Sequence, residues 1–460
     1  MAAEAIRCGG DSMTVLCRIT AVGCWLLSLT PAHSAEDGTL IQEKFSTGYQ
    51  FHVNSKTELV GTLALPKETE QASAKTLAIT GSSSIEYDEK ILSLDAGGSV
   101  QKTARIYRRM DFQRKVGDKL QQSSLRPAVR RLVVLRNNHL EVPFSPDGPL
   151  TWGEIDLVRT DVFTPALAGL FPDHPVKVGD RWTAATSAVQ ELTDMERIEE
   201  GSLECRFDQI TTLERRRLAR VVFSGSVRGV NEDGPNRQQL DGYFFFDLQS
   251  NHLSYLSLKG AHFLLDKDGK AIGKVEGQFV LSRQAPGSSK ELSEEAWKGV
   301  LTEPDSENTL MLYKNEELGV QFLHSRRWRV AGVQGRQITL DESMGNGLLI
   351  TIETPIATPS ADQYLREVRD WLQKQQAKVF KIESPTPLPG PVPAVEQFSV
   401  DMELQGKRSW MKYLVIRQRN GGATLAARLS HKDLTALQTD VDKIARSLTI
   451  VGAVSDNSKK

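Results

Sequence analysis

Cysteine is scarce in this sequence. The 460 residues include four cysteines, and three of them lie within the first 24 residues. Cys205 is the only one that follows, so the rest of the chain cannot form an internal disulfide. Cys205 could act as a nucleophile or as an intermolecular tether, but the alternation of apolar and polar residues in SLECRF favours a half-buried thiol on a strand. We therefore expect side-chain packing alone to stabilise the fold.

Short motifs for catalysis and metal binding are also missing. The sequence has no G-x-S-x-G elbow, no HExxH pair, no CxxC pair and no glycine-rich phosphate loop. The eight histidines are scattered singly, without the spacing that a metal site prefers. The stretch DKDG at 266–269 lacks the further carboxylates of a calcium loop, so it predicts a hairpin turn. We predict no catalytic residues, no metal ligands and no cofactor, although acidic pairs assembled across strands stay open.

An excess of charge of either sign is absent as well. The chain has 57 Lys and Arg against 58 Asp and Glu, so it has no overall attraction to nucleic acid, which is not an expected partner. One segment departs from this balance, because residues 101–136 contain eleven basic and two acidic residues, a net charge of +9. The candidate patch for an anionic partner comprises Arg105, Arg108, Arg109, Arg114, Lys115, Arg130 and Arg131.

Two interpretations of this patch are open. Arg105, Arg109 and Lys115 occupy odd positions of a predicted strand, so we expect them to share one face. That face could bind acidic polysaccharide or lipid head groups of a cell envelope. The alternative, which we favour, is that the segment only balances the acidic stretches at 190–204 and 291–307.

Residues 1–35 have the layout of a secretory signal peptide, with an alternative start at Met13. A cation precedes an apolar stretch at 19–29, and a proline and small residues follow it. This stretch is about half as long as the ~20 residues that span a bilayer as a helix. Cleavage after Ser34 is favoured over a permanent anchor, and a lipoprotein box ending at Cys24 is a further alternative. The protein is then secreted or periplasmic, with no stable transmembrane span.

Residues 36–284 have the pattern of short strands separated by turns. Apolar and polar residues alternate in many segments, and the pairs at 137–138, 233–234 and 268–269 are typical of hairpin turns. Helical signal is weak. We predict an antiparallel β domain, either an open sheet or a half-barrel, with two sub-lobes that split near residues 150–175.

Two stretches of this domain resemble a pattern found in uncharacterised exported bacterial β domains. They are FPDHPVKVGDRW at 171–182 and GYFFFDLQSNHLSYLSLKG at 242–260. Those domains are distantly similar to the half-barrel lipid carriers of the bacterial envelope. The resemblance does not carry over transport activity. It implies an alternative in which Phe244, Phe246 and Leu248 line a cavity for an apolar ligand or lipid.

Residues 285–308 change character and predict a domain boundary. They are rich in proline, serine and acidic residues, which indicates a solvated acidic linker with one short helix near 291–300. Residues 309–452 then have the pattern of a second domain, and 453–460 that of a disordered tail.

A helix is predicted early in this second domain. Ser360 and Gln363 have the spacing of a capping box, which satisfies backbone N–H groups at a helix start. Five residues follow at helical spacing and should form its buried face. They are Tyr364, Leu365, Val368, Trp371 and Leu372.

Trp328 lies in LGVQFLHSRRWRV, where a strand pattern ends between arginines. It could be a binding platform, but its large apolar body favours a place in the core of a small domain, packed beneath a helix. Arg326, Arg327 and Arg329 would then be charges at the rim of that core.

The order of these features resembles the PsbP-like family. The matching stretches are LYKNEELGVQF, the RRWRV tryptophan, the helix after TPSADQYL, and KIARSLTIV. The resemblance implies a twisted antiparallel sheet with packed helices, partner binding, and no shared catalytic residues. The predicted fold class of the whole chain is therefore α+β.

Three functional hypotheses follow from these observations. The leading one is an exported, non-enzymatic binding or adaptor protein of the bacterial cell envelope, whose partner is an envelope protein, acidic polysaccharide or lipid. The second is a carrier of an apolar ligand in the first β domain. The third is a hydrolase whose site is assembled across strands.

Overall fold

The computed structural model describes residues 38–64, 76–137, 140–232, 234–390 and 394–451. The predicted signal peptide and the predicted tail lie outside these ranges. The chain divides into two compact units, which are considered separately. Unit 1 comprises residues up to 143 together with 153–300, and unit 2 comprises 144–152 together with the chain from 301 onwards.

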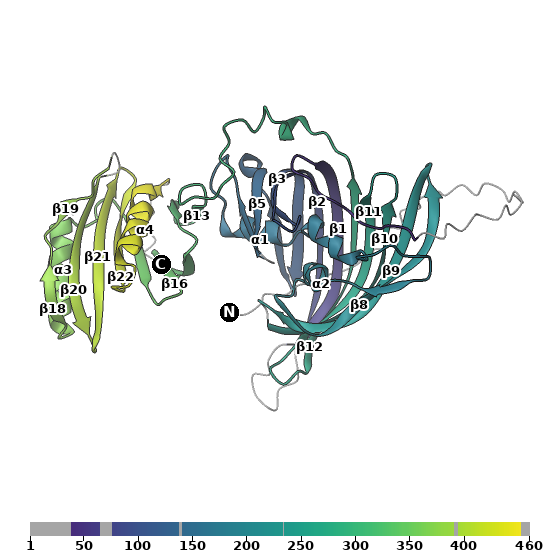
Figure 1. The fold of residues 1–460 in the computed structure, drawn as a ribbon. Helices are drawn as coiled ribbons and strands as arrows, with labels where there is room; N and C mark the ends of the chain where they lie inside the picture. Colours follow the sequence, from purple (N-terminus) through teal and green to yellow (C-terminus); the bar gives the residue numbers. More distant parts are fainter. Residues whose placement is uncertain (1–37, 65–75, 138–139, 233, 391–393, 452–460) are drawn as a thin grey trace, which may run out of the picture. The chain divides into compact units, whose positions relative to one another are not determined.

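Unit 1 is built around one 12-stranded, mainly antiparallel sheet. The sheet is strongly curved, and two short helices lie on its inner side (Figure 1). These are α1 (Trp152–Arg159) and α2 (Thr186–Thr193). The strands are β1 (Gln50–Ala64), β2 (Thr76–Leu94), β3 (Val100–Val116), β4 (Lys119–Ser124), β5 (Arg131–Asn137), β6 (Leu140–Phe144), β7 (Arg181–Thr183), β8 (Arg197–Leu213), β9 (Arg216–Asn231), β10 (Gly234–Asp247), β11 (His252–Leu265) and β12 (Ala271–Gln284).

The order of strands excludes the predicted division into sub-lobes. Along the sheet it is β6-β5-β3-β2-β1-β12-β11-β10-β9-β8-β7, with β4 paired to β3. Because β1 pairs with β12 over most of its length, strands that precede and follow residues 150–175 belong to the same sheet. The segment at 150–175 instead supplies α1 and the 3₁₀ helix Thr164–Leu170.

The predicted α+β class is wrong, because the protein is nearly all β. Strand accounts for 55% of the structure and helix for 14%. Within the described residues there are four α-helices, of 8 to 14 residues, whereas β2 alone has 19 residues. The long strands arise because polar residues on the solvated face of an antiparallel sheet do not interrupt its hydrogen-bonded ladder.

A row of glycine and leucine residues crosses the middle of this sheet. In order from β2 to β9 it is Gly81, Leu59, Gly277, Gly260, Leu240 and Gly225. Directly opposed residues project from the same face. The leucines cover the glycines: a Cβ atom on Gly277 would lie 3.0 Å from Leu59 Cδ2, and one on Gly260 would lie 2.9 Å from Leu240 Cδ2. Because glycine has no side chain, this row allows the sheet to bend sharply and leaves its inner surface shallow there.

The glycines of this row should differ in their tolerance of a side chain. A Cβ on Gly225 would lie 2.1 Å from the backbone oxygen of Ser202, whereas on Gly260 it meets the end of the Leu240 side chain, which can move. We expect Gly225→Ala to lower the free energy of unfolding by about 1–3 kcal/mol, and Gly260→Ala to cost clearly less. Urea denaturation of both variants measures this difference. Equal losses would contradict the predicted backbone clash.

The stretch predicted as a solvated linker packs on unit 1 up to residue 300. Leu292 and Trp297 are buried, and Trp297 Nε1 donates a hydrogen bond to the Glu291 carbonyl, 2.9 Å away. The Arg131 guanidinium lies 5.5 Å from the centre of the Trp297 ring, and Lys90 pairs with Glu294. In place of the predicted helix the stretch has the 3₁₀ turn Lys290–Leu292, followed by further turns.

Unit 2 contains an eight-stranded sheet and a three-stranded sheet. The first has the order β15-β16-β17-β22-β21-β20-β18, with β19 paired to β20, and the second has the order β13-β14-β23. The strands are β13 (Met311–Asn315), β14 (Val320–His324), β15 (Trp328–Gln334), β16 (Gln337–Glu342), β17 (Gly347–Glu353), β18 (Lys378–Ile382), β19 (Thr386–Pro387), β20 (Val395–Leu404), β21 (Lys407–Gln418), β22 (Gly421–Leu429) and β23 (Thr449–Ile450).

Two helices cover opposite faces of the larger sheet. Helix α3 (Ala361–Lys374) packs against Phe398 and Tyr413, and α4 (Leu434–Ser447) packs against Leu414 and neighbouring strands. The predicted capping box is present, since the side chains of Ser360 and Gln363 each accept a hydrogen bond from the backbone N–H of the other. The buried face of α3 differs from the prediction in one residue, because Trp371 is 42% exposed.

Trp328 is a core residue and not an exposed platform. Its side chain is fully buried among residues of α4 and the larger sheet. The indole Nε1 donates a hydrogen bond to Asp440 Oδ2 on α4 at 3.3 Å, so the polar edge of the ring is satisfied. Of the flanking arginines, Arg327 is partly exposed near Asp440, and Arg329 lies 4.6 Å from the centre of the Trp152 ring.

Candidate functional site

An apolar cavity of about 390 Å³ lies on the inner face of the unit 1 sheet. Its floor includes Gly260 and Gly277 of the glycine row, and one wall is the end of α2 at Leu192–Asp194. Most of the remaining lining is hydrocarbon. These side chains are Leu59, Ile79, Phe112, Leu240, Leu258, Leu264, Val275 and Phe279.

The cavity exists because the core fills only one end of the curved sheet. On β12, inward-facing Leu281 is fully buried, whereas Val275, six residues away on the same face, is only partly buried. On β1, Val53 is fully buried and Leu59 is again partly exposed. Helices α1 and α2 close the filled end, and the unfilled end leaves apolar side chains open to a ligand.

The residues predicted to line a cavity do not line this one. Phe244 and Phe246 are fully buried and pack against Phe171, with ring centres 5.6 and 5.2 Å away. They belong to the filled end of the sheet, and Leu248 lies beyond the end of β10. The alternation of these residues correctly indicated the inner face, but it carried no information about where along the strand the core ends.

A few polar side chains border the cavity. Gln238 and His262 are directly opposed on β10 and β11, and Arg114 is opposite Gly81. The Gln238 amide donates a hydrogen bond to the Thr193 carbonyl at the end of α2, at 2.6 Å. A mostly apolar lining with a small number of fixed polar groups is typical of small-molecule sites.

The predicted patch does not form one surface. In β3, Arg109 is opposite Glu86 and Tyr107 is opposite Tyr87, so Arg108 is an extra residue that forms a β-bulge. Odd-numbered residues therefore project from one face of the sheet before the bulge and from the other face after it. Arg105 is consequently on the inner face and fully buried, whereas Arg109 is exposed. The expectation that Arg105, Arg109 and Lys115 share a face is therefore wrong.

The other residues of the predicted patch also lie in different places on unit 1. Arg114 lines the inner cavity, and Arg131 lies against the Trp297 ring. Arg108 and Arg130 are brought together, because Arg130 donates a hydrogen bond to the Arg108 carbonyl at 3.3 Å. Arg108 itself pairs with Asp88 and Glu291. Anion binding by the exposed members of the patch stays a prediction.

Arg105 is the centre of a buried ionic cluster. Its guanidinium donates to Glu89 Oε1 at 2.8 Å, to the Tyr107 hydroxyl at 3.1 Å and to Asp161 Oδ2 at 3.4 Å. The Tyr87 ring centre lies 4.9 Å from the guanidinium carbon. Burial opposes the charge on Arg105, but the neighbouring Glu89 and other groups outweigh it and raise the pKa of Arg105 well above its usual value.

A second arginine extends this cluster. Arg136 pairs with Glu191 at 2.6 Å, and Glu141 Oε1 lies 3.7 Å from Arg136 and 4.0 Å from Arg105. Burial raises the pKa of Glu141 to about 8 and that of Asp161 to about 7. Both carboxyls therefore tend to hold a proton near neutral pH. Since its members are buried, the cluster serves the fold and is not accessible to a partner.

A polar pocket of about 450 Å³ on the outer face contains the closest approach to a catalytic arrangement. His52 Nδ1 is 2.8 Å from Asp88 Oδ1, and Ser289 also hydrogen-bonds the Asp88 side chain. Burial tends to raise the pKa of Asp88, but hydrogen bonds from His52 and Arg108 outweigh it and lower that pKa. In an activated serine the histidine lies between the hydroxyl and the carboxylate. Here the carboxylate lies between them, so the arrangement does not support the hydrolase hypothesis.

Cys205 is fully buried on β8. Burial raises the pKa of its thiol to about 12, which disfavours the thiolate that a nucleophile requires. Within the described ranges, no three His, Cys, Asp or Glu side chains are grouped so that they could hold a metal ion. The same ranges contain no helix with the length and hydropathy of a membrane span.

Comparisons with known proteins give little further information. No family model and no curated protein matches the chain. A solved structure with some similarity is the solution structure of cyanobacterial PsbP (CyanoP) from Synechocystis sp. PCC 6803. The identity is 16%, the match covers 31% of this chain and 92% of that chain, and the TM-score is 0.24. This likeness is weak, and no family is assigned from it.

Proposed function

We propose that the protein is a non-enzymatic binding protein that holds an apolar or amphiphilic ligand in the inner cavity of unit 1. The observation that supports this proposal is the partly exposed hydrocarbon lining at the unfilled end of the sheet. Covering such a surface is favourable by roughly 25 cal/mol per Å² of apolar area removed from water. A cavity of about 390 Å³ lies within the usual range for small-ligand sites.

The setting that we propose is the bacterial cell envelope. The signal-peptide layout of the first 35 residues supports export, and the order of motifs in 309–452 supports a PsbP-like unit that contacts a partner protein. Unit 2 would then act as an adaptor, while unit 1 binds the ligand. Localisation of a tagged full-length chain by cell fractionation tests export, and a cytoplasmic signal alone would contradict it.

Ligand binding predicts a specific effect of filling the cavity. Val275 faces inwards and is partly buried, whereas Val60 is 52% exposed on the opposite face. We expect Val275→Trp to weaken binding of a long-chain fluorescent fatty acid at least about tenfold, because the indole occupies the volume of the ligand. Val60→Trp is the matched control and should bind as the wild type does.

Native mass spectrometry of the purified chain provides an independent measurement. A bound apolar molecule should be retained by the wild type and by Val60→Trp, and lost from Val275→Trp. The proposal fails if the wild type shows no bound mass and no saturable probe binding. It also fails if both tryptophan variants bind the probe equally well.

A further inference from the structure

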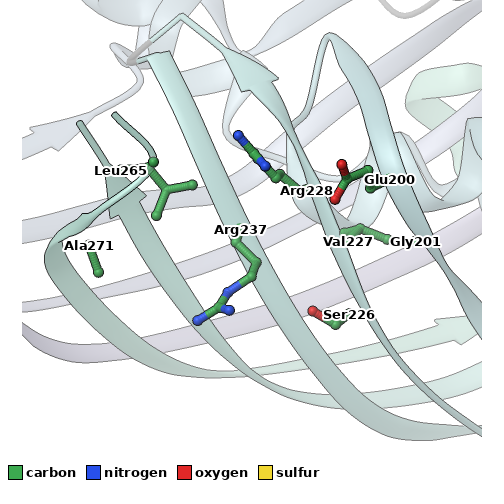
Figure 2. A pocket seen from close by; sticks show the side chains of 9 residues that line it. Glu200, Gly201, Ser226, Val227, Arg228, Arg237, Leu265 and Ala271 are labelled. Carbon is green, nitrogen blue, oxygen red and sulfur yellow. The ribbon is translucent and has the colours of Figure 1, made fainter. Parts of the chain in front are cut away.

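A separate pocket of about 380 Å³ lies on the outer face of the same sheet, at β8 to β12. Figure 2 shows Arg228 and Arg237 on neighbouring strands, with Leu265 and Ala271 on one side of them and Glu200 on the other. The pocket is distinct from the inner cavity, because outward-facing and inward-facing residues alternate along these strands.

The two arginines lie in an electrostatically unfavourable arrangement. Arg228 on β9 is directly opposite Arg237 on β10, and like charges in that position destabilise a sheet. Among the described residues, neither guanidinium has a carboxylate oxygen within the 4.0 Å of an ion pair. Arg228 Nε is also buried without a hydrogen-bond partner, which costs about 1–3 kcal/mol when such a group stays unsatisfied.

The Phe263 ring lies beside the two arginines and contacts both Arg237 and Lys274. Phe263 on β11 is opposite Arg237, and Lys274 on β12 is opposite Phe263. The Arg237 guanidinium lies 4.6 Å from the ring centre, and Lys274 Nζ lies 5.8 Å from it. The ring therefore helps to fix the position of Arg237, whereas Lys274 is already paired with Glu276 at 2.6 Å.

Glu200 is the one acidic side chain among the lining residues. It is exposed and opposite Arg228 in the register, yet no ion pair joins the two. In Figure 2 the two guanidiniums point in different directions. This is the arrangement expected of two like charges that repel each other.

We propose that this pocket binds the phosphate group of a small ligand. Guanidinium groups donate pairs of hydrogen bonds that match phosphate oxygens, and two of them can neutralise a doubly charged group. The Ser226 hydroxyl is a further donor, and Leu265 and Ala271 offer apolar contact to the rest of the ligand. The negative charge of the phosphate would offset the repulsion between the opposed arginines.

Calorimetric titration of the full chain at low salt tests this proposal. The probes are inorganic phosphate, glycerol phosphate and acetate. We expect saturable binding of phosphate, at least about tenfold weaker in Arg228→Gln and in Arg237→Gln. The control is Arg197→Gln, since Arg197 is exposed and already pairs with Glu199 at 2.8 Å. Tighter binding of glycerol phosphate would identify a phosphate ester as the ligand, and equal affinities would identify free phosphate.

Glu200, the acidic residue of the pocket, provides a second test with the opposite expected effect. Glu200→Gln should tighten phosphate binding about two- to tenfold, because it removes a negative charge from the pocket. This variant keeps the proposal testable if an arginine variant does not fold. The proposal is overturned if phosphate does not saturate, if acetate binds as well as phosphate, or if all arginine variants and Arg197→Gln lose the same affinity.

Discussion

Replacing Arg105 by methionine should destabilise unit 1 by about 3–5 kcal/mol, the usual cost of removing one partner from a buried ion pair. Arg105 is fully buried and donates to Glu89, Tyr107 and Asp161. Its removal leaves Glu89 without a compensating charge in a medium of low polarity. The loss is much of the total stability of an ordinary domain.

Urea denaturation followed by circular dichroism measures this loss. The matched control is Arg109→Met, four positions away on the same strand, because that side chain is exposed and its removal should change the free energy of unfolding by no more than about 0.5 kcal/mol. A triple variant, Arg105→Met with Glu89→Leu and Asp161→Leu, should recover part of the loss, since it removes Arg105 together with the carboxyls that face it. Equal stability of the Arg105 and Arg109 variants would contradict the role of the cluster.

This cluster also depends on features that the sequence alone does not reveal. The alternation in β3 correctly indicated a strand, but the bulge at Arg108 exchanges its faces, and nothing in the local pattern of charges marks a bulge. The alternation alone therefore predicts that Arg105 is one of the exposed basic residues. Its acidic partners come from β2, β6, the end of α1 and α2, so they could not be recognised before the strand order was known.

Local features were more predictable than long-range ones. The capping box at Ser360 and Gln363 and the burial of Trp328 depend on neighbouring residues or on the size of one side chain, and the structure has both. The packing of 285–300 on unit 1 is not predictable from the sequence, because a polar, proline-containing stretch resembles a linker whether or not Leu292 and Trp297 are buried against a surface. The strand content was underestimated for a related reason, since short turn-like pairs do not reveal how far a ladder extends.

The candidate ligand site was only partly predictable. The glycines of the central row are visible in the sequence, yet their significance arises from a register that pairs distant residues, such as Leu59 with Gly277. Aromatic residues such as Phe244 looked like a cavity lining and instead fill the core. The unfilled end is defined by where α2 stops, which is a property of packing rather than of any motif.

Stability should fall as the pH rises from about 5 to 8. Burial raises the pKa of Glu141 from 4.5 to about 8 and that of Asp161 from 3.8 to about 7. Between these values the folded state holds protons that the unfolded state has released. For each such proton, the free energy of unfolding falls by about 1.4 kcal/mol when the pH rises by one unit. The stabilising effect of these two groups is thus complete below about pH 4 and is lost by about pH 8.

Urea denaturation at pH 5.5, 7.0 and 8.5 gives the slope directly. Glu141→Gln resembles the protonated carboxyl in shape and cannot release a proton, so we expect it to flatten the slope and to be more stable than the wild type at pH 8.5. Glu58→Gln is the control, because Glu58 is exposed on the outer face. A wild type that is equally stable at pH 5.5 and 8.5 would contradict the raised pKa of both carboxyls. A Glu141→Gln variant with an unchanged slope would contradict the raised pKa of Glu141.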